Sequence, residues 1–485
     1  MNLKGLLKKY NNLSLPVKAV FWFTICNFIL KGISFITVPI FTRMLSTSEY
    51  GVASLYYSYE QIFIILATFE LSLGAYQRGV LKFKEDIPLF TQSMQLLSTS
   101  LTMIFLVIFL LFSDQIVKLT GIPFNVFSVM FGYLILQPAY NAWLTRKRFY
   151  YEYKQSVIVT VLFAILTVGA SMAAVTFIES TAYMKVTSML WMEILFCLPF
   201  YLKNINVRNI IKNKEEVIFY WKYLLRFQIP LVFHSLSYLV LGQADRIMIG
   251  SMVGTSETAI YSVAYSLASV LSIFQVSINQ SFKPWRYQKL EDKNYSDVKN
   301  VSNVLLIFMG VVVLAFILVA PEVMKLLFNP EYYDAIWIIP SVTLSVYFMF
   351  LYNIFTDIES YYGETRYIAV VSVICALVNI VLNYFAIEIF GYIACGYTTL
   401  FSYILFSMLH YFFMNKVCKE NIGLEQPVDR KFILIFSMIL LVSTIVITLL
   451  YNYNLIRLLL LLILLVILVI KRKVFIQLVK NIKKP

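Results

Sequence analysis

Charged residues are scarce in this sequence, at 14% of its 485 residues, whereas soluble domains carry about a quarter. Hydrophobic residues make up 60% of the chain, and the mean hydropathy is +0.77. This composition excludes a soluble globular protein. Apolar runs of about 17 to 25 residues are long enough to cross a bilayer as helices. We therefore predict an all-α polytopic membrane protein.

Several chemical signatures are also missing. There is no GxxxxGK[ST] loop, no GxGxxG stretch after a strand, and no polar loop longer than about twenty residues to hold a nucleotide. The five cysteines form no CxxC pair, and two histidines, His234 and His410, are too few for a metal site. These absences exclude an ATP-driven pump, predict no cofactor, and leave no argument for an enzyme.

Fourteen apolar runs recur along the chain with short polar breaks between them. The longest polar break lies near residues 281–300. We predict transmembrane helices over 16–45, 51–73, 93–113, 124–144, 157–178, 183–202, 230–253, 258–281, 301–320, 332–354, 367–390, 392–414, 432–450 and 455–470.

The distribution of basic residues supports an even number of spans. With the N-terminus inside, the predicted cytoplasmic segments hold 33 of the 40 Lys and Arg residues, as expected for cytoplasmic loops. The weakest segment follows the tenth span, where Arg366 stands alone beside Asp357, Glu359 and Glu364. We predict that both termini are cytoplasmic and that the net charge of +14 faces anionic lipid rather than nucleic acid.

One short stretch occurs twice. "MLSTSEYGVASLYYS" at 44–58 matches "MVGTSETAIYSVAYS" at 252–266 in seven of fifteen positions, and weaker matches follow in order at similar offsets. Local capping chemistry explains the shared "TSE" but not the later matches. We predict two six-helix lobes, 1–210 and 211–425, followed by two further helices in 426–485. Because the offset spans six helices, the lobes are parallel repeats, as in transporters that work by alternating access.

Three stretches carry a family resemblance: "LKGISFITVPIFTRMLSTSEYGVASLY" at 30–56, "IPLVFHSLSYLVLGQADRIMIGSMVGTSETAIYSVAYSLASV" at 229–270, and "GETRYIAVVSVICALVNIVLNYFAIEIFGYIACGY" at 363–397. The sequence resembles the Wzx-type polysaccharide and oligosaccharide flippases of the MOP superfamily, which also contains the MATE exporters. The resemblance implies that an undecaprenyl-pyrophosphate-linked oligosaccharide moves from the inner to the outer leaflet of a bacterial plasma membrane. It also implies membrane lipids and other polysaccharide-assembly membrane proteins as partners.

Such a substrate needs a polar, cationic cavity, so basic residues within spans are the candidates for contact with pyrophosphate or sugar. Lys31, near the middle of the first span, is the first candidate, and its alternative role is pairing with Glu60 or Glu70. Arg246, beside Asp245 in the seventh span, is the second, and either residue of that pair could instead hold a neighbouring helix. Arg43 and Arg78 lie near helix ends, where snorkelling to head groups competes with substrate contact.

Without a nucleotide site, transport must draw on an ion gradient or on the substrate gradient. Glu60, Glu70 and Asp245 are the carboxylates predicted to couple H⁺ or Na⁺. Glu193 and His234 are weaker candidates for contact with the substrate. Two other functions stay open. A MATE-like drug exporter would favour an acidic cavity, whereas a glycan polymerase or glycosyltransferase of the membrane would be expected to carry a large outer loop.

Overall fold

The computed structural model describes residues 14–364, 366–423 and 426–466, and all regular secondary structure within these ranges is helical. The chain divides into two compact units at Leu239 and Val240. Unit 1 ends at Leu239 and unit 2 begins at Val240, and the two are described separately.

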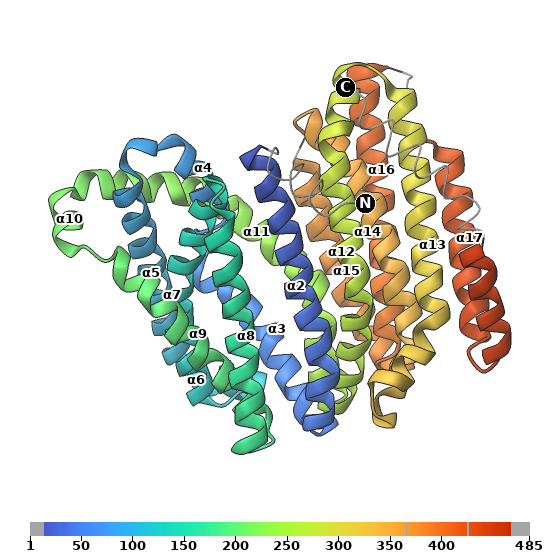
Figure 1. Cartoon of the computed structure of the whole chain (residues 1–485), viewed down its shortest axis with the longest axis horizontal. Helices are drawn as coiled ribbons and strands as arrows, with labels where there is room; N and C mark the ends of the chain where they lie inside the picture. The colour runs from blue at the N-terminus through green and yellow to red at the C-terminus, as the bar shows by residue number, and fades with distance from the viewer. Residues whose placement is uncertain (1–13, 365, 424–425, 467–485) are drawn as a thin grey trace, which may run out of the picture. The chain divides into compact units, whose positions relative to one another are not determined.

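Unit 1 contains long helices joined by short turns (Figure 1). Its helices are α2 (Leu15–Met44), α3 (Thr47–Thr68), α4 (Gly74–Lys82), η1 (Lys84–Asp86), α5 (Ile87–Leu111), α6 (Ser113–Thr120), α7 (Phe124–Phe149), α8 (Tyr153–Phe177), α9 (Ala182–Asn204), α10 (Val207–Lys212) and the first part of α11 (Lys214–Met252).

Unit 2 begins within α11. Its other helices are α12 (Thr255–Glu291), α13 (Tyr295–Leu327), η2 (Pro330–Trp337), α14 (Ile339–Tyr361), α15 (Arg366–Phe390), α16 (Ala394–Ile422), α17 (Arg430–Leu449) and a last apolar helix, Asn454–Val466.

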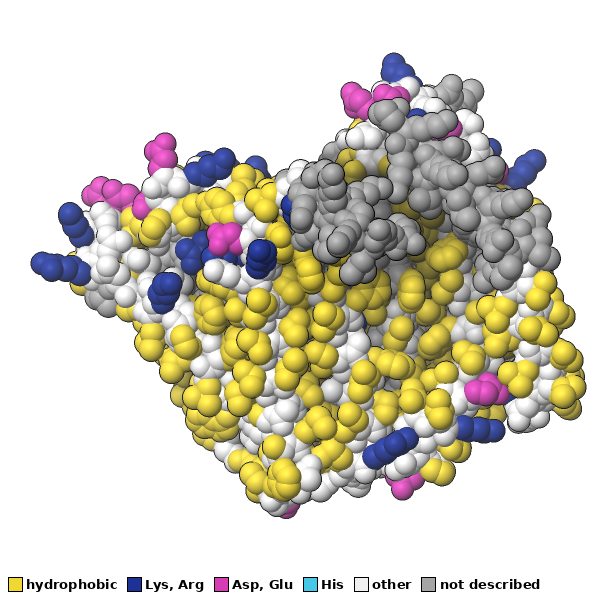
Figure 2. Space-filling view, viewed as in Figure 1, with side chains coloured by type: hydrophobic (Ala, Val, Ile, Leu, Met, Phe, Trp, Pro, Cys, Tyr) yellow, Lys and Arg dark blue, Asp and Glu magenta, His cyan; other side chains and the backbone are white. Residues whose placement is uncertain are grey.

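Each of the fourteen predicted spans overlaps a helix of the structure, and residues 467–470 of the last predicted span lie outside the described residues. Among the described residues, nine helices are long and apolar enough to cross a membrane, and two bent pairs raise this number to eleven. Helices α3 and α16 have 22 and 29 residues but are more polar, and Asn454–Val466 is shorter. The protein is an all-α polytopic membrane protein. On the face in Figure 2, hydrophobic side chains cover the helix flanks and charged ones gather at the helix ends.

The predicted limits of several spans were wrong. The segment 281–300 is mostly helix rather than loop, because α12 continues to Glu291 and α13 begins at Tyr295. At the same end of unit 2, Asp357 and Glu359 lie in the last turns of α14 and are buried, although we assigned them to a loop. A criterion based on hydropathy ends a span at its first charged residues, whereas the backbone hydrogen bonds of the helix continue beyond the apolar run.

The duplicated stretch starts corresponding helices in the two units. The "TSE" triplets occupy the first three positions of α3 and α12, where Glu49 and Glu257 lie in the first turn and favour the helix N-terminus. Several packing pairs also correspond: α7 packs against α3, α5 and α9 as α14 packs against α12, α13 and α16, and α8 packs against α9 as α15 packs against α16. Both units follow one plan.

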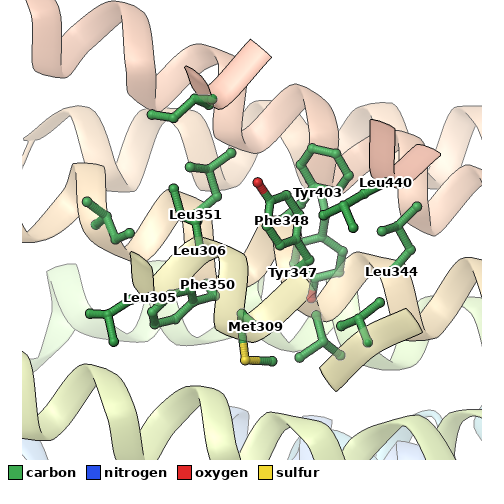
Figure 3. Packing of buried hydrophobic residues seen from close by; sticks show 14 of the residues in the cluster. Leu305, Leu306, Met309, Leu344, Tyr347, Phe348, Phe350, Leu351, Tyr403 and Leu440 are labelled. Carbon is green, nitrogen blue, oxygen red and sulfur yellow. The ribbon is translucent and has the colours of Figure 1, made fainter. Parts of the chain in front are cut away.

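Helix α14 is the centre of unit 2. Most of its side chains are buried, and they pack against apolar residues of α13, α16 and α17 (Figure 3). In a bilayer the lipid tails are as apolar as these side chains, so close van der Waals packing holds such helices together. This packing makes α14 a fixed frame for the neighbouring helices that carry polar groups.

The two C-terminal helices are anchored to unit 2 by polar groups at their ends. Arg457 is fully buried and donates two hydrogen bonds, of 2.9 and 2.6 Å, to the carboxylate of Glu322 on α13. Asp429 caps α17 by accepting a hydrogen bond from the backbone N–H of Phe432. That hydrogen bond, and the nearby ammonium of Lys299, hold the pKa of Asp429 below its ordinary value.

Candidate functional site

A buried carboxylate lies between four helices of unit 2. Asp245 of α11 is completely buried and accepts hydrogen bonds from Asn383 Nδ2 of α15 at 2.6 Å and from Thr399 Oγ1 of α16 at 2.6 Å. The hydroxyl of Tyr261 on α12 also donates to it. No ion pair with Asp245 occurs among the described residues. Burial of a charge without an ionic partner costs free energy, and the hydrogen bonds from the surrounding donors offset only part of this cost.

Further oxygen atoms surround this carboxylate, and we call the group of Asp245, Asn379, Asn383, Thr398 and Thr399 the Asp245 centre. The hydroxyl of Thr398 donates to Asn383 Oδ1, and Asn383 Nδ2 is 3.2 Å from Asn379 Oδ1. Among the described residues, no three His, Cys, Asp or Glu side chains are grouped to hold a metal ion. One carboxylate with amide and hydroxyl oxygens has the chemistry to take a proton or a hard monovalent cation.

Arg246 points away from its neighbour Asp245 and makes separate contacts. Its Nε donates to Ser262 Oγ at 3.1 Å, one terminal nitrogen donates to Gln243 Oε1 at 2.6 Å, and the guanidinium lies 4.6 Å from the ring centre of Tyr265. Only 7% of the residue is exposed. The side chain joins α11 to α12, which is the helix-holding alternative considered above.

A cavity of about 240 Å³ lies in unit 1 between α3, α7 and α9. Three carboxylates line it, those of Glu60, Glu70 and Glu193, and the charges of Glu60 and Glu193 are close enough to interact. Three amides, two phenols and two aliphatic hydroxyl groups complete its polar lining: Gln61, Gln137, Asn141, Tyr57, Tyr133, Thr68 and Ser72. The residues lining this cavity include no Lys or Arg, so it is acidic, opposite to the cationic cavity that we expected.

Glu70 reaches this cavity from a break in the chain rather than from a helix. Helix α3 ends at Thr68, and Phe69 and Glu70 have φ angles of 51° and 49°, in the left-handed region. Residues with a Cβ atom rarely adopt this conformation, and two in succession hold strain that surrounding contacts must offset. The predicted helix 51–73 was therefore wrong beyond Thr68.

The other predicted site residues do not line this acidic cavity. Lys31 is exposed on α2 and has no ion pair among the described residues, so it pairs with neither Glu60 nor Glu70. Arg43 is exposed at the last turn of α2. Arg78 is exposed on α4, with its guanidinium 5.0 Å from the ring centre of Phe227. The side chain of His234 lies outside what the structure describes.

Sequence reasoning missed a group of buried charges near the end of α14. His410 Nδ1 of α16 lies 3.1 and 3.0 Å from the two carboxylate oxygens of Glu359, and both side chains are fully buried. Asp357 is buried as well and pairs with Arg286 and with Lys283, the latter at 3.0 Å. Asp357 and Glu359 are two residues apart on one helix, and their basic partners lie on other helices. Only the fold shows that these residues are neighbours.

Comparison with known families gives two matches. The profile of a family described as "Polysaccharide biosynthesis protein" matches residues 17–288, which is more than half of the chain. A second profile, described as "MatE", matches residues 230–385, which include Asp245, Arg246 and both asparagines of the Asp245 centre.

Relatives and solved structures agree with these matches. An Lsg locus protein of Haemophilus influenzae is 27% identical over 176 residues, which cover 35% of this chain and 42% of the relative. The chain thus spans less than half the length of the curated relatives that it matches.

A structure of the lipid II flippase MurJ in an inward closed conformation has a TM-score of 0.65 at 14% identity, covering 94% of this chain and all of that one. An inward-facing MATE multidrug transporter of the MOP superfamily has a TM-score of 0.60 at 12% identity over 81% of this chain and 96% of its own. These structures share the fold.

Proposed function

This chain belongs to the polysaccharide biosynthesis protein family, and we propose that it is a flippase for a lipid-linked oligosaccharide. It carries an undecaprenyl-pyrophosphate-linked repeat unit from the cytoplasmic to the outer leaflet of a bacterial plasma membrane. The family match over residues 17–288 is the observation that carries this proposal. A fold shared over 94% of the chain with a structure named as a lipid II flippase supports it.

The mechanism is alternating access by the two units, with both termini in the cytoplasm. The 33 basic residues in the predicted inner segments support this orientation. The lipid tail can stay in hydrocarbon while pyrophosphate and sugars cross between polar side chains. In this mechanism the exposed Lys31 on α2, without an ionic partner among the described residues, contacts the pyrophosphate.

Coupling takes place at the Asp245 centre. A proton or Na⁺ bound at Asp245 neutralises the buried carboxylate and changes how α11, α15 and α16 are held together, because α15 and α16 each supply a group that donates a hydrogen bond to this carboxylate. Release of the cation leaves an unpaired buried charge, which favours rearrangement of the same helices. Glu60, Glu70 and Glu193 in unit 1 are a second set of carboxylates that can take up a proton.

The test is complementation of a bacterial strain that lacks its own flippase. The wild-type chain is compared with Lys31→Ala and Asp245→Asn at matched membrane levels, and surface glycan and accumulated lipid-linked precursor are measured. We expect the wild type to restore surface glycan and both variants to accumulate precursor. Failure of the wild type with an expressed, folded chain would refute the proposal.

One observation favours a second candidate, a cation-coupled exporter of organic cations. The cavity in unit 1 has three carboxylates and no basic residue in its lining, which suits a cationic guest better than a pyrophosphate. The "MatE" match over residues 230–385 supports the same candidate. Under this alternative the wild type would raise resistance to cationic dyes in a strain lacking its own exporters, and Glu60→Gln would abolish that resistance.

A further inference from the structure

A second cavity of unit 1 lies where α5 begins and where α7 and α9 end. Its volume is about 390 Å³, and three basic residues line it: Arg146, Lys147 and Lys203. Glu152 is the one acidic residue in its lining, and it pairs with Lys147. Two positive charges of the lining are therefore left without a carboxylate from the lining.

Arg146 carries the strongest sign of an absent partner. Its Nε is buried and has no hydrogen-bond partner, and its guanidinium makes no ion pair within the described ranges. A buried donor on a charged group costs more than an exposed one if it stays unpaired. Lys203, in the last turn of α9, is exposed and likewise has no ion pair in the part of the chain that the structure describes. An oxyanion in the cavity would satisfy both groups.

The rest of the lining suits a hydroxylated group attached to that oxyanion. The rings of Trp143 and Phe200 lie 5.0 Å apart between centres, and both face the cavity. The side chains of Gln92 and Asn204 add amide groups that can donate and accept hydrogen bonds. Aromatic rings beside basic side chains are typical of the depth at which lipid head groups lie.

We propose that this cavity, which we call the Arg146 pocket, binds the phosphate of a lipid head group. A phosphate ester supplies the oxyanion for Arg146 and Lys203, and its glycerol or sugar contacts the rings. The head group comes either from an anionic phospholipid or from the pyrophosphate-linked carrier, and only the second source rests on the proposed function. In the proposed orientation the pocket faces the cytoplasmic leaflet, where the carrier is loaded.

A simpler role for these residues is compensation of the helix dipole, because Arg146, Lys147 and Arg148 all lie in the last turn of α7. Arg148 supplies the matched control. It has the same charge in the same turn, but it is exposed, does not line the pocket, and lies 5.9 Å from the ring centre of Phe23. A dipole or general surface-charge effect would make Arg146 and Arg148 equivalent.

The experiment measures lipid binding to the purified full chain by native mass spectrometry. The probes are phosphatidylglycerol, phosphatidylcholine and undecaprenyl pyrophosphate, and the variants are Arg146→Gln, Lys203→Gln, their double variant, and Arg148→Gln. We expect the double variant to bind phosphatidylglycerol or undecaprenyl pyrophosphate about tenfold more weakly, which corresponds to about 1.4 kcal/mol. We expect Arg148→Gln to stay within about twofold of the wild type, since it loses no contact in the pocket.

The two sources are separated by the probes. Tighter binding of undecaprenyl pyrophosphate than of phosphatidylglycerol, lost in the double variant, would assign the pocket to the carrier; equal binding of both, also lost, would assign it to phospholipid. Equal affinities in all variants, or an equal loss in Arg148→Gln, would overturn the proposal. Lys203 is exposed, so Lys203→Gln keeps the test valid if Arg146→Gln does not fold. Because no transport is measured, a chain that binds head groups but moves no glycan would refute the proposed function alone.

Discussion

Asp245→Asn is the substitution that most sharply separates folding from coupling. Asparagine has nearly the same volume as aspartate, so the packing between α11, α12, α15 and α16 is conserved. The negative charge is removed, and with it the cation or proton that the Asp245 centre takes up. We therefore expect a chain that folds normally, because an unpaired buried carboxylate is itself costly, but that no longer responds to its coupling ion.

The size of the lost response follows from linkage. A ligand that binds only the folded state at 100 times its Kd stabilises that state by about 2.7 kcal/mol. For a unit of this size each kcal/mol raises the unfolding temperature by about 2 to 4 °C. Saturating Na⁺ at constant ionic strength, or acidification if the ligand is a proton, should therefore raise the unfolding temperature of the wild type by roughly 5 to 10 °C.

The assay is thermal unfolding of the purified chain in detergent, with Na⁺ replaced by choline and with pH varied separately. Asp292→Asn is the matched control, because Asp292 is exposed at the end of α12. The wild type and the control should show the same shift with one of the two ligands, and Asp245→Asn should show neither. A full shift in Asp245→Asn would refute the assignment of the coupling site.

Three further predictions concern the polar groups that hold unit 2 together. His410→Ala and Glu359→Ala should each lower the free energy of unfolding by about 1 to 3 kcal/mol, because each leaves a buried polar side chain without its hydrogen-bond partner. Thermal unfolding should show that the double variant costs less than the sum of the two, and additive costs would contradict the pairing. Arg457→Ala should speed hydrogen exchange in Asn454–Val466 by about tenfold or more by removing the contact with Glu322, whereas unchanged exchange would mean that apolar packing suffices. Asp429→Ala should lower the free energy of unfolding by about 1 kcal/mol, because a helix cap is lost. Since the pKa of Asp429 is lowered in the fold, its contribution to stability is present above its unfolded pKa of about 3.9 and is lost as the pH falls through the folded pKa. Hydrogen exchange in the first turn of α17 should show this pH dependence in the wild type and lose it in Asp429→Asn.

The helices could be predicted from the sequence because hydrocarbon leaves the backbone few choices. The apolar runs located helices, of which nine to eleven among the described residues are long and apolar enough to cross a membrane, and the repeated "TSE" stretch located the starts of α3 and α12. The break after Thr68 could not be predicted, since neither Phe69 nor Glu70 is a residue type that marks a left-handed turn. Only contacts with other helices can impose such a conformation.

The partners of Asp245 show where sequence reasoning stops. Asn379 and Asn383 are four residues apart, on one face of a mostly apolar helix, and this spacing in α15 is a signal that could have been noticed. Both asparagines lie more than 130 residues from Asp245 in the sequence, so only the fold shows that they are its neighbours. The acidic cavity is similar, because Glu193 and Glu60 meet only through the packing of α3 against α9.

The central claim, that this chain moves a lipid-linked oligosaccharide between leaflets, is tested most directly in vesicles. The purified chain is reconstituted with a fluorescent undecaprenyl-pyrophosphate-linked oligosaccharide, and a membrane-impermeant quencher reports the fraction in the outer leaflet over time. The account predicts that the wild type exchanges the label between leaflets and that Lys31→Ala and Asp245→Asn slow this exchange. A rate equal to that of protein-free vesicles, from a chain that is folded and that still exports an organic cation, would contradict it.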